Sequence, residues 1–137
     1  MAMRLIGAAL FLVFLMTGAA MGDFIGQGDK EVQAVADPIL DNLLAGFNED
    51  NYKKYSKDFN ETLKEVITEK KFAEVRGSIL TKLGKYQSHT YLGFLNQGRM
   101  TAILYKGKFV ATQDDVLIKL VLSKRQGGVV VTGLWFQ

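Results

Sequence analysis

The chain has 137 residues, 48% of them hydrophobic and 23% charged, a length that allows one domain with a core large enough to fold without metal or disulfide staples. Cysteine is absent, which excludes disulfides, zinc–thiolate sites, cysteine nucleophiles and lipid attachment through an N-terminal cysteine. The net charge of +3 is unevenly divided, because residues 23–65 hold ten acidic and five basic residues whereas residues 66–137 hold four acidic and eleven basic residues.

The first 22 residues have the layout of a secretory signal peptide. Arg4 is their single charge, an apolar block fills positions 5–16, and small residues follow at positions 18–20. Cleavage after Ala20 or Gly22 fits this pattern. An uncleaved membrane anchor is the alternative, because positions 5–22 form an uncharged run near the lower limit for spanning a bilayer. Either reading predicts export to the periplasm, cell surface or extracellular space. Residues 23–29 are predicted to form a flexible tether, and residues 30–137 a single domain.

The first predicted helix runs roughly from Asp29 to Phe47. Its apolar residues recur every four positions on one face, the pattern of an amphipathic helix. Pro38 interrupts this stripe, so the helix either kinks there or properly begins there. We favour one kinked helix, because the stripe continues on both sides of the proline.

Three shorter helical segments are predicted next. Residues 52–57 have room for only one helical turn. Asp58, with Glu61 three residues later, resembles a capping box, which predicts a helix that starts there and ends at Val66. The last helix is predicted over residues 68–83, and Gly84 stands where a left-handed C-cap belongs.

From Tyr86 onward the apolar period changes to two, which predicts four antiparallel strands: 86–95, 99–110, 116–124 and 129–136. Two-residue turns at Gln97-Gly98 and Gln126-Gly127 would place Leu92 opposite Ile103, and Ile118 opposite Trp135. The predicted fold class is therefore α+β, with N-terminal helices packed on a curved four-stranded meander.

Strict alternation divides the strand residues between two faces. The face predicted to contact the helices carries Leu92, Phe94, Ile103, Tyr105, Phe109, Val116, Ile118, Leu120, Leu122, Val131 and Trp135. The opposite face carries an apolar patch of Tyr91, Leu95, Met100, Leu104, Leu117, Val121, Leu134 and Phe136. Apolar patches of this extent usually mark partner surfaces, so a homodimer packed face to face is predicted. Coverage of the patch by chain tails or by barrel curvature is the alternative.

Short motifs carry a family resemblance: Asp58-Phe59, Leu83-Gly84-Lys85-Tyr86, Tyr105-Lys106-Gly107-Lys108-Phe109 and Gly133-Leu134-Trp135-Phe136. With the order of elements, they resemble a small prokaryotic secreted family of domains of unknown function in the cystatin-like, nuclear-transport-factor-two-like superfamily. The likeness covers roughly residues 30–137. It implies an α+β cone in which helices pack into a curved antiparallel sheet around a cavity, and relatives that stand alone or precede hydrolase domains.

Enzymes of that superfamily hold an acid or base beside a hydrogen-bonding partner inside the cone. Asp58 with Tyr55 or Tyr105 is the candidate pair for a lyase or isomerase, and the N-cap role of Asp58 is the alternative. The single histidine, His89, is predicted on the face opposite the helices, so no Ser-His-Asp set can be assembled. No catalytic residue is assigned.

Aromatic residues near the predicted cone suggest a ligand pocket, with apolar walls and a few hydroxyl or indole donors. The candidate lining residues are Tyr55, Asp58, Phe59, Phe72, Tyr105 and Trp135, for which core packing is the alternative reading. No metal or cofactor is predicted, because the acidic pair at positions 114–115 has no further oxygen ligands nearby.

The prediction for function is an exported, non-catalytic binding or interaction domain that takes a small apolar ligand or a protein partner, with a superfamily lyase or isomerase as the alternative. Lys106, Lys108 and Lys119 make one end of the sheet basic, but no arginine stripe with interleaved aromatics accompanies them, so no nucleic-acid partner is predicted. Membrane contact is predicted only if the N-terminal segment stays uncleaved.

Overall fold

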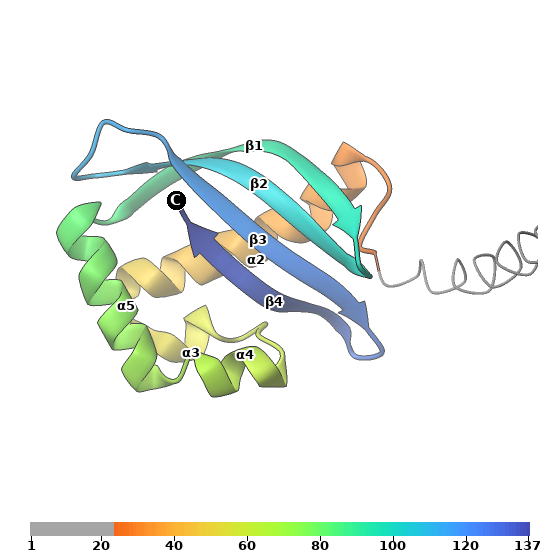
Figure 1. The fold of residues 1–137 in the computed structure, drawn as a ribbon, viewed down its shortest axis with the longest axis horizontal. Helices are drawn as coiled ribbons and strands as arrows, with labels where there is room; N and C mark the ends of the chain where they lie inside the picture. Colours follow the sequence, from red (N-terminus) through yellow and green to blue (C-terminus); the bar gives the residue numbers. More distant parts are fainter. Residues whose placement is uncertain (1–23) are drawn as a thin grey trace, which may run out of the picture.

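The computed structural model describes residues 24–137, so the predicted signal segment lies outside the described residues. Its helices are α2 (Asp29–Glu49), α3 (Tyr52–Tyr55), α4 (Glu61–Val66) and α5 (Glu69–Lys82), and its strands are β1 (Tyr86–Gln97), β2 (Met100–Phe109), β3 (Val116–Arg125) and β4 (Gly128–Phe136). The strands form one antiparallel sheet in the order β1-β2-β3-β4, against which the helices pack (Figure 1). The predicted α+β class is confirmed. None of the helices within residues 24–137 is long and apolar enough to cross a membrane.

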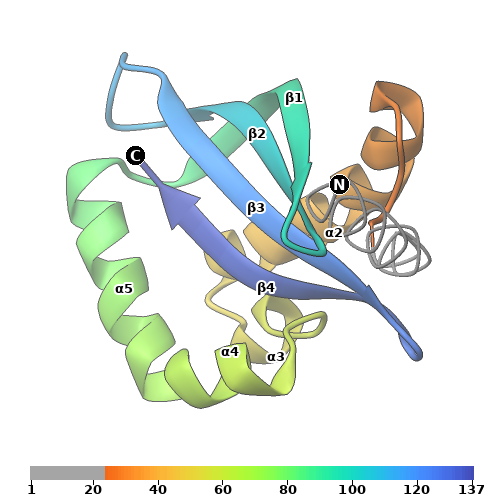
Figure 2. The ribbon, with the colours of Figure 1, turned by 45° about the vertical axis from the view of Figure 1, so that its right-hand side comes forward.

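Helix α2 crosses one face of the sheet, which we call the inner face (Figures 1 and 2). It is one continuous helix with Pro38 inside it, so the reading in which the helix begins at Pro38 is wrong. Its buried stripe consists of Val32, Ala36, Leu40, Leu43, Leu44, Gly46 and Phe47. The spacing of these residues puts them on the side of α2 that faces the strands.

The start of α4 differs from the prediction. Asn60, and not Asp58, is the N-cap, since its side chain accepts a hydrogen bond from the Leu63 amide at 2.8 Å. Asp58 precedes an extended segment in which Phe59 pairs in parallel with Val131 of β4. The helix begins after this pairing, because extended residues cannot also take helical dihedral angles. Helix α5 starts and ends as predicted, with Gly84 in the left-handed region at a φ of 77°.

The hairpin between β1 and β2 turns at Gly98-Arg99 and not at Gln97-Gly98. Both turn residues have positive φ, 60° and 64°, as a two-residue turn of type I′ requires. Ile103 consequently pairs with Phe94, and the predicted pairing of Ile103 with Leu92 is wrong.

A β-bulge in β1 changes which side chains reach the inner face. Tyr91 pairs with Tyr105 and Gly93 pairs with Leu104, so Leu92 is an extra residue between two pairs. Leu92 is 56% exposed, contrary to its predicted place in the core. Tyr91 and His89 lie on the inner face, although strict alternation had placed both on the opposite face.

A second bulge has the same effect in β4. Leu122 pairs with Val131 as predicted, but Val121 pairs with Gly133, so the alternation shifts by one residue beyond this point. Leu134 and Phe136 therefore face the helices, and Trp135 faces outward beside Lys119. The predictions for these three β4 residues are wrong, and Ile118 and Trp135 lie on opposite faces of the sheet.

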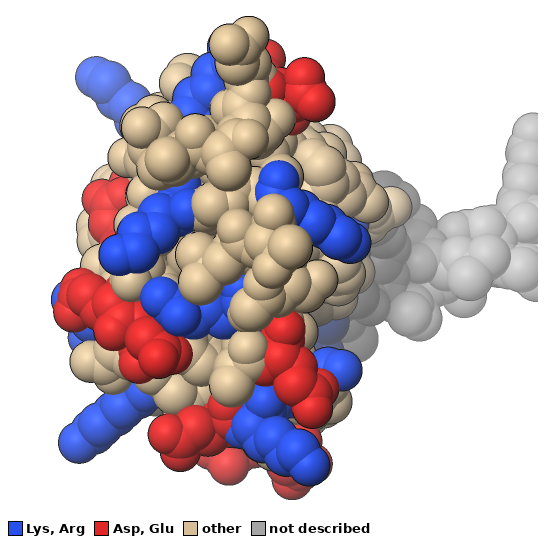
Figure 3. Space-filling view, turned by 90° about the vertical axis from the view of Figure 1, so that its left-hand side faces the viewer, with Lys and Arg blue, Asp and Glu red and all other residues tan. Residues whose placement is uncertain are grey.

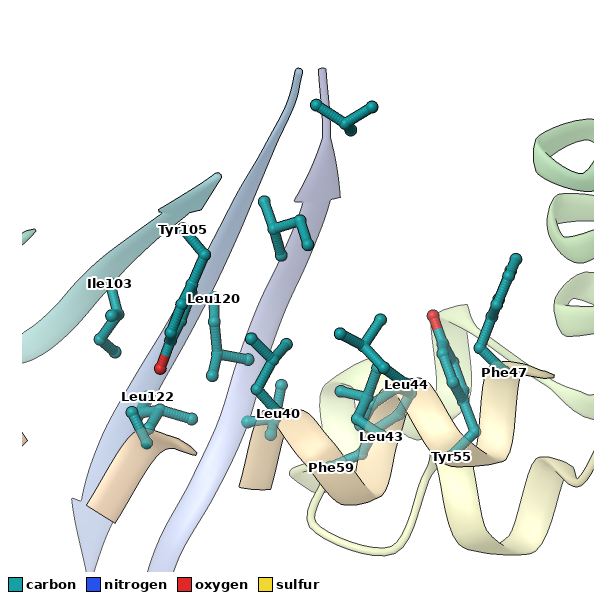
Figure 4. Close-up of a cluster of buried hydrophobic side chains, with 14 of the residues drawn as sticks. Leu40, Leu43, Leu44, Phe47, Tyr55, Phe59, Ile103, Tyr105, Leu120 and Leu122 are labelled. Carbon is teal, nitrogen blue, oxygen red and sulfur yellow. The ribbon is translucent and has the colours of Figure 1, made fainter. Parts of the chain in front are cut away.

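The core lies between α2 and the inner face of the sheet. Tyr105, Ile103, Leu120 and Leu122 point from the strands toward Leu40, Leu43 and Leu44 of α2, with Tyr55, Phe59 and Phe47 beyond them (Figure 4). All ten of these residues are at most 6% exposed. Side chains thus fill the space beneath the centre of the sheet, and room for a ligand lies elsewhere.

Candidate functional site

A hollow of about 430 Å³ lies beside the core, between the edge strand β4 and helices α3, α4 and α5. We call it the β4 groove. Its lining residues are Tyr55, Phe59, Leu63, Val66, Ile67, Val75, Ile79, Thr132, Gly133, Leu134, Trp135 and Phe136. None of these twelve residues is charged, and ten carry large apolar or aromatic side chains, which is the composition expected of a ligand-binding cleft.

The groove exists because α5 contacts the sheet so little. Phe72 is the only fully buried residue of α5, and it packs on Tyr55 and Tyr52 with ring centroids 4.6 and 5.7 Å apart. Three and seven residues further along, Val75 and Ile79 line the groove without being fully buried. A second hollow of about 370 Å³ shares Ile79 and Phe136 with the first, so the cleft continues along α5.

Charges of both signs surround this side of the molecule. Seen from the α5 side, lysine and arginine alternate with aspartate and glutamate around uncharged surface (Figure 3). Such a mixture produces no strong field of one sign. Apolar contact and hydrogen bonding, rather than net charge, must therefore decide what the groove accepts.

Strand β4 presents backbone hydrogen-bonding groups to the groove. Gln137 and Leu117 exchange two backbone hydrogen bonds at 2.7 and 2.8 Å. Because bonded and non-bonded pairs alternate along an antiparallel ladder, Leu134 and Phe136 direct their N–H and C=O groups away from β3. The backbone N–H and C=O groups of these two residues therefore face the edge of the sheet that borders the groove.

The same edge already binds another part of the chain. The Val131 amide donates to the Asp58 carbonyl at 2.7 Å, and the Asn60 amide donates to the Val131 carbonyl at 3.0 Å. Within residues 24–137, this segment is the only one whose backbone pairs with that edge of β4. The edge therefore accepts an extended chain at Val131 and stays open from Leu134 onward.

Trp135, the single tryptophan, lies where the groove meets the outer face of the sheet. It lines the groove and also a hollow of about 320 Å³ on the outer face, and it is 49% exposed. The indole lies over Gly133, where a Cβ atom would collide with it, and the Lys119 ammonium lies 5.0 Å from its ring centroid. Ligands in either hollow would change the surroundings of this fluorophore.

The six predicted pocket residues are only partly brought together. Tyr55, Phe59 and Trp135 line the groove, whereas Asp58, Phe72 and Tyr105 do not. Burial raises the pKa of Tyr55 to about 12, so its hydroxyl stays protonated at neutral pH. The lining residues of α4 and α5 were not predicted, and the apolar pair Val66-Ile67 at the C-terminal end of α4 was the available signal.

Tyr105 belongs to a different cluster, at the interface of α2 with β1 and β2. Its hydroxyl donates to Asp37 Oδ1 at 2.8 Å, and the Tyr91 hydroxyl donates to Asp29 Oδ1 at 2.7 Å. Burial, followed by the hydrogen bond to Asp37, raises the pKa of Tyr105 far above its usual range. Tyr105 is thus engaged with Asp37, and the structure does not place it with Asp58.

His89 completes this cluster on the inner face. Its Nδ1 lies 2.5 Å from the Tyr86 hydroxyl, and its Nε2 lies 3.7 Å from Asp41 Oδ1. Burial, with a smaller contribution from the Asp41 charge, raises the pKa of Tyr86 to about 12. Alternating tyrosine and histidine residues opposite α2 aspartates were the signal for these contacts, which fasten the helix to β1 and β2.

The outer face carries five of the eight predicted patch residues: Leu95, Met100, Leu104, Leu117 and Val121. Trp135 joins them, while Tyr91, Leu134 and Phe136 lie on the inner face. Leu95 and Met100 are 60% and 39% exposed, so the face keeps an accessible apolar area.

No cluster of three or more His, Asp or Glu side chains able to hold a metal ion occurs among residues 24–137. Asp115, one of the acidic pair at positions 114–115, is bound by Lys108, and this hydrogen bond lowers the pKa of Asp115.

No known family model matches the sequence, and a search of curated proteins finds no relative.

Proposed function

We propose that this protein is a non-catalytic binding domain whose ligand is an extended apolar peptide segment held in the β4 groove. The observation that supports the proposal is the joint presence of apolar walls and an open strand edge. Apolar walls alone would suit a small molecule. The outward peptide groups of Leu134 and Phe136 suit a polypeptide, since a strand added to a sheet edge gains main-chain hydrogen bonds.

The pairing of Phe59 with Val131 supports this reading, because it demonstrates that the edge accepts an extended chain. A peptide following that segment along β4 would meet Val75 and Ile79 of α5 on its other side. Side chains alternate along an extended peptide, so every second residue would point toward the apolar wall. The expected ligand has apolar residues at alternate positions.

The test is selection from a displayed library of heptapeptides, followed by titration of the selected peptide while Trp135 emission is recorded. We expect saturable binding that is lost when the same peptide carries N-methyl groups on its pairing face. In the protein, Leu134→Pro removes one outward N–H and is expected to weaken binding about tenfold. Leu134→Val keeps the N–H and is the matched control.

Two outcomes would contradict the peptide proposal. One is a library that yields no peptide with alternating apolar residues. The other is equal affinity of the selected peptide for the Leu134→Pro and Leu134→Val proteins. If 1-anilinonaphthalene-8-sulfonate or another small apolar probe alone saturates the Trp135 response, a small-molecule pocket is the better description of the groove.

A homodimer through the outer face of the sheet is a second proposal, supported by the exposed Leu95, Met100 and Trp135 around the 320 Å³ hollow. We expect sedimentation equilibrium at micromolar concentration to give the mass of two chains. Leu95→Glu would place a charge in the patch and is expected to give single chains, while Ala34→Glu, exposed on α2 on the other side of the sheet, would leave the dimer intact. A single-chain mass for the unmodified protein would end this proposal.

Export and the superfamily assignment are also proposals, supported by the N-terminal sequence pattern and by the order of helices and strands. An enzyme that uses Asp58 with a pocket tyrosine is disfavoured, because Asp58 does not line the groove that Tyr55 lines, and the Tyr105 hydroxyl donates to Asp37. We therefore place the function in binding rather than in catalysis.

A further inference from the structure

One end of the sheet gathers basic residues at the tips of both hairpins. A hollow of about 360 Å³ there is lined by Gly98, Arg99, Met100, Ser123, Lys124 and Arg125. The side chains of Lys124 and Arg125 are exposed and belong to no ion pair among residues 24–137. This hollow is thus polar and cationic, in contrast to the uncharged β4 groove.

The chain enters the domain at this same end. The Ile25 amide donates to the Thr101 hydroxyl at 3.4 Å, and the Asn96 side-chain amide donates to the Gly26 carbonyl at 2.8 Å. Thr101 is next to Met100 in β2 and pairs with Leu122, beside Ser123, so this entry point adjoins the basic hollow. Ile25 is itself buried, which fixes the position of the entry.

The sequence before this point is uncharged and apolar from position 5 to position 22. Asp23 and Phe24 are the two residues between Gly22 and Ile25, and three chain positions span at most about 10 Å. If the apolar run is retained in a bilayer, the hairpin tips are held close to the lipid headgroups. Tethering of this kind raises the local concentration, so a few cationic contacts are enough to set an orientation.

We propose that the end of the domain formed by the two hairpin tips docks on an anionic membrane surface, with Lys124 and Arg125 contacting lipid headgroups. Basic residues next to a membrane-inserted segment each contribute attraction to anionic lipid. Met100 lies at the rim of the same hollow and is 39% exposed, so it provides an apolar contact beside the charges. The acidic residues near this end include Asp29 and Glu31 of α2 on the inner side of the sheet, where Asp29 binds Tyr91, and Asp58, whose backbone carbonyl binds the Val131 amide of β4.

The absence of cysteine allows a clean test, because a single introduced cysteine can carry an environment-sensitive fluorophore. Gly127→Cys puts the label at the β3–β4 tip, where a Cβ atom meets no other atom within 4 Å. Gln113→Cys puts the control label in the exposed loop between β2 and β3, at the other end of β3. The full-length protein is reconstituted into vesicles of equimolar phosphatidylglycerol and phosphatidylcholine, or of phosphatidylcholine alone.

We expect a blue shift of the Gly127→Cys label only in the anionic vesicles, with no shift of the Gln113→Cys label, and reversal of the shift at about 0.5 M salt. Changing both Lys124 and Arg125 to glutamine is expected to lower the ratio of docked to undocked protein roughly 30-fold. Circular dichroism of this double variant checks that it stays folded.

The proposal is wrong if the Gly127→Cys label responds equally to both kinds of vesicle, or if both labels respond alike. It is also wrong if millimolar inorganic phosphate produces the same shift without vesicles, since the hollow would then be a site for a free anion. Peptide binding in the β4 groove is measured separately, so failure here leaves that proposal unaffected.

Discussion

Replacing Gly46 with alanine is expected to lower the free energy of unfolding by about 3 kcal/mol. A Cβ atom at this position of α2 would lie 2.5 Å from the Tyr55 backbone nitrogen and 2.9 Å from the Tyr55 Cα atom. Both neighbours are backbone atoms of α3, so the overlap cannot be relieved by a side-chain rotation. The free-energy cost of this overlap exceeds the stabilisation of up to about 1 kcal/mol that alanine gives relative to glycine in a helix interior.

Gly77→Ala is the matched control, because Gly77 lies in exposed α5 and a Cβ atom there meets nothing within 4 Å. It is expected to raise the free energy of unfolding by about 0.5 to 1 kcal/mol. Urea denaturation of the three proteins provides the measurement. If both alanine variants shift the urea midpoint in the same direction, α2 and α3 do not approach each other closely at Gly46.

Replacing Arg76 with methionine is expected to cost about 2 to 3 kcal/mol of stability and to loosen α5. Arg76 donates from Nε to the Phe47 carbonyl at 2.6 Å and from its guanidinium to the Asn48 carbonyl at 3.2 Å. These carbonyls belong to the last turn of α2, which contains no basic residue of its own. Arg76 therefore supplies both the hydrogen bonds and the positive charge that a helix C-terminus favours.

Hydrogen exchange measured residue by residue should locate this effect. Phe72 is the only fully buried residue of α5, so the amides between Phe72 and Gly84 should exchange faster in Arg76→Met. Lys71→Met is the control, since the Lys71 side chain is 53% exposed and its ion pair with Glu74 spans 3.7 Å. Equal exchange in the two variants would mean that α5 is held mainly by other contacts.

The helices and strands were predictable because their signals are local. The apolar stripe of α2 continues on both sides of Pro38. Gly84 marks the end of α5, because the residue after this helix adopts a positive φ, which glycine allows without strain. Each strand follows from alternation within a few residues. Local propensity and tertiary structure agree in these elements, so the α+β class followed from sequence alone.

The faces of the sheet were predicted only as far as the first irregularity. A bulge adds one unpaired residue, and strands of similar composition can carry it at several positions, so nothing in the sequence marks Leu92 as the extra residue. Beyond the second bulge, Trp135 and Phe136 exchange the roles that alternation had assigned to them. The site was missed for a related reason, because the groove depends on how far α5 lies from β4.

Contacts between distant parts of the chain were the least predictable. Arg76 binds carbonyls 28 and 29 positions earlier, and Tyr105 binds Asp37 across 68 positions. No periodic pattern reports such pairs, since each depends on the final packing of α2 against its neighbours. The aspartates of α2 contact the tyrosines and the histidine of the sheet, so the acidic and basic halves of the chain meet there.

The order of the elements along the chain has a consequence for biosynthesis. Within residues 24–137 every helix precedes every strand, so the apolar stripe of α2 leaves the ribosome well before the sheet that covers it. Each strand pairs only with the strand before or after it in the sequence, so the hairpins can form one after another as the chain emerges. Until β4 is made and Val131 meets Asp58 and Asn60, the apolar stripe of α2 lacks the sheet that buries it, and apolar surface exposed in this way promotes aggregation.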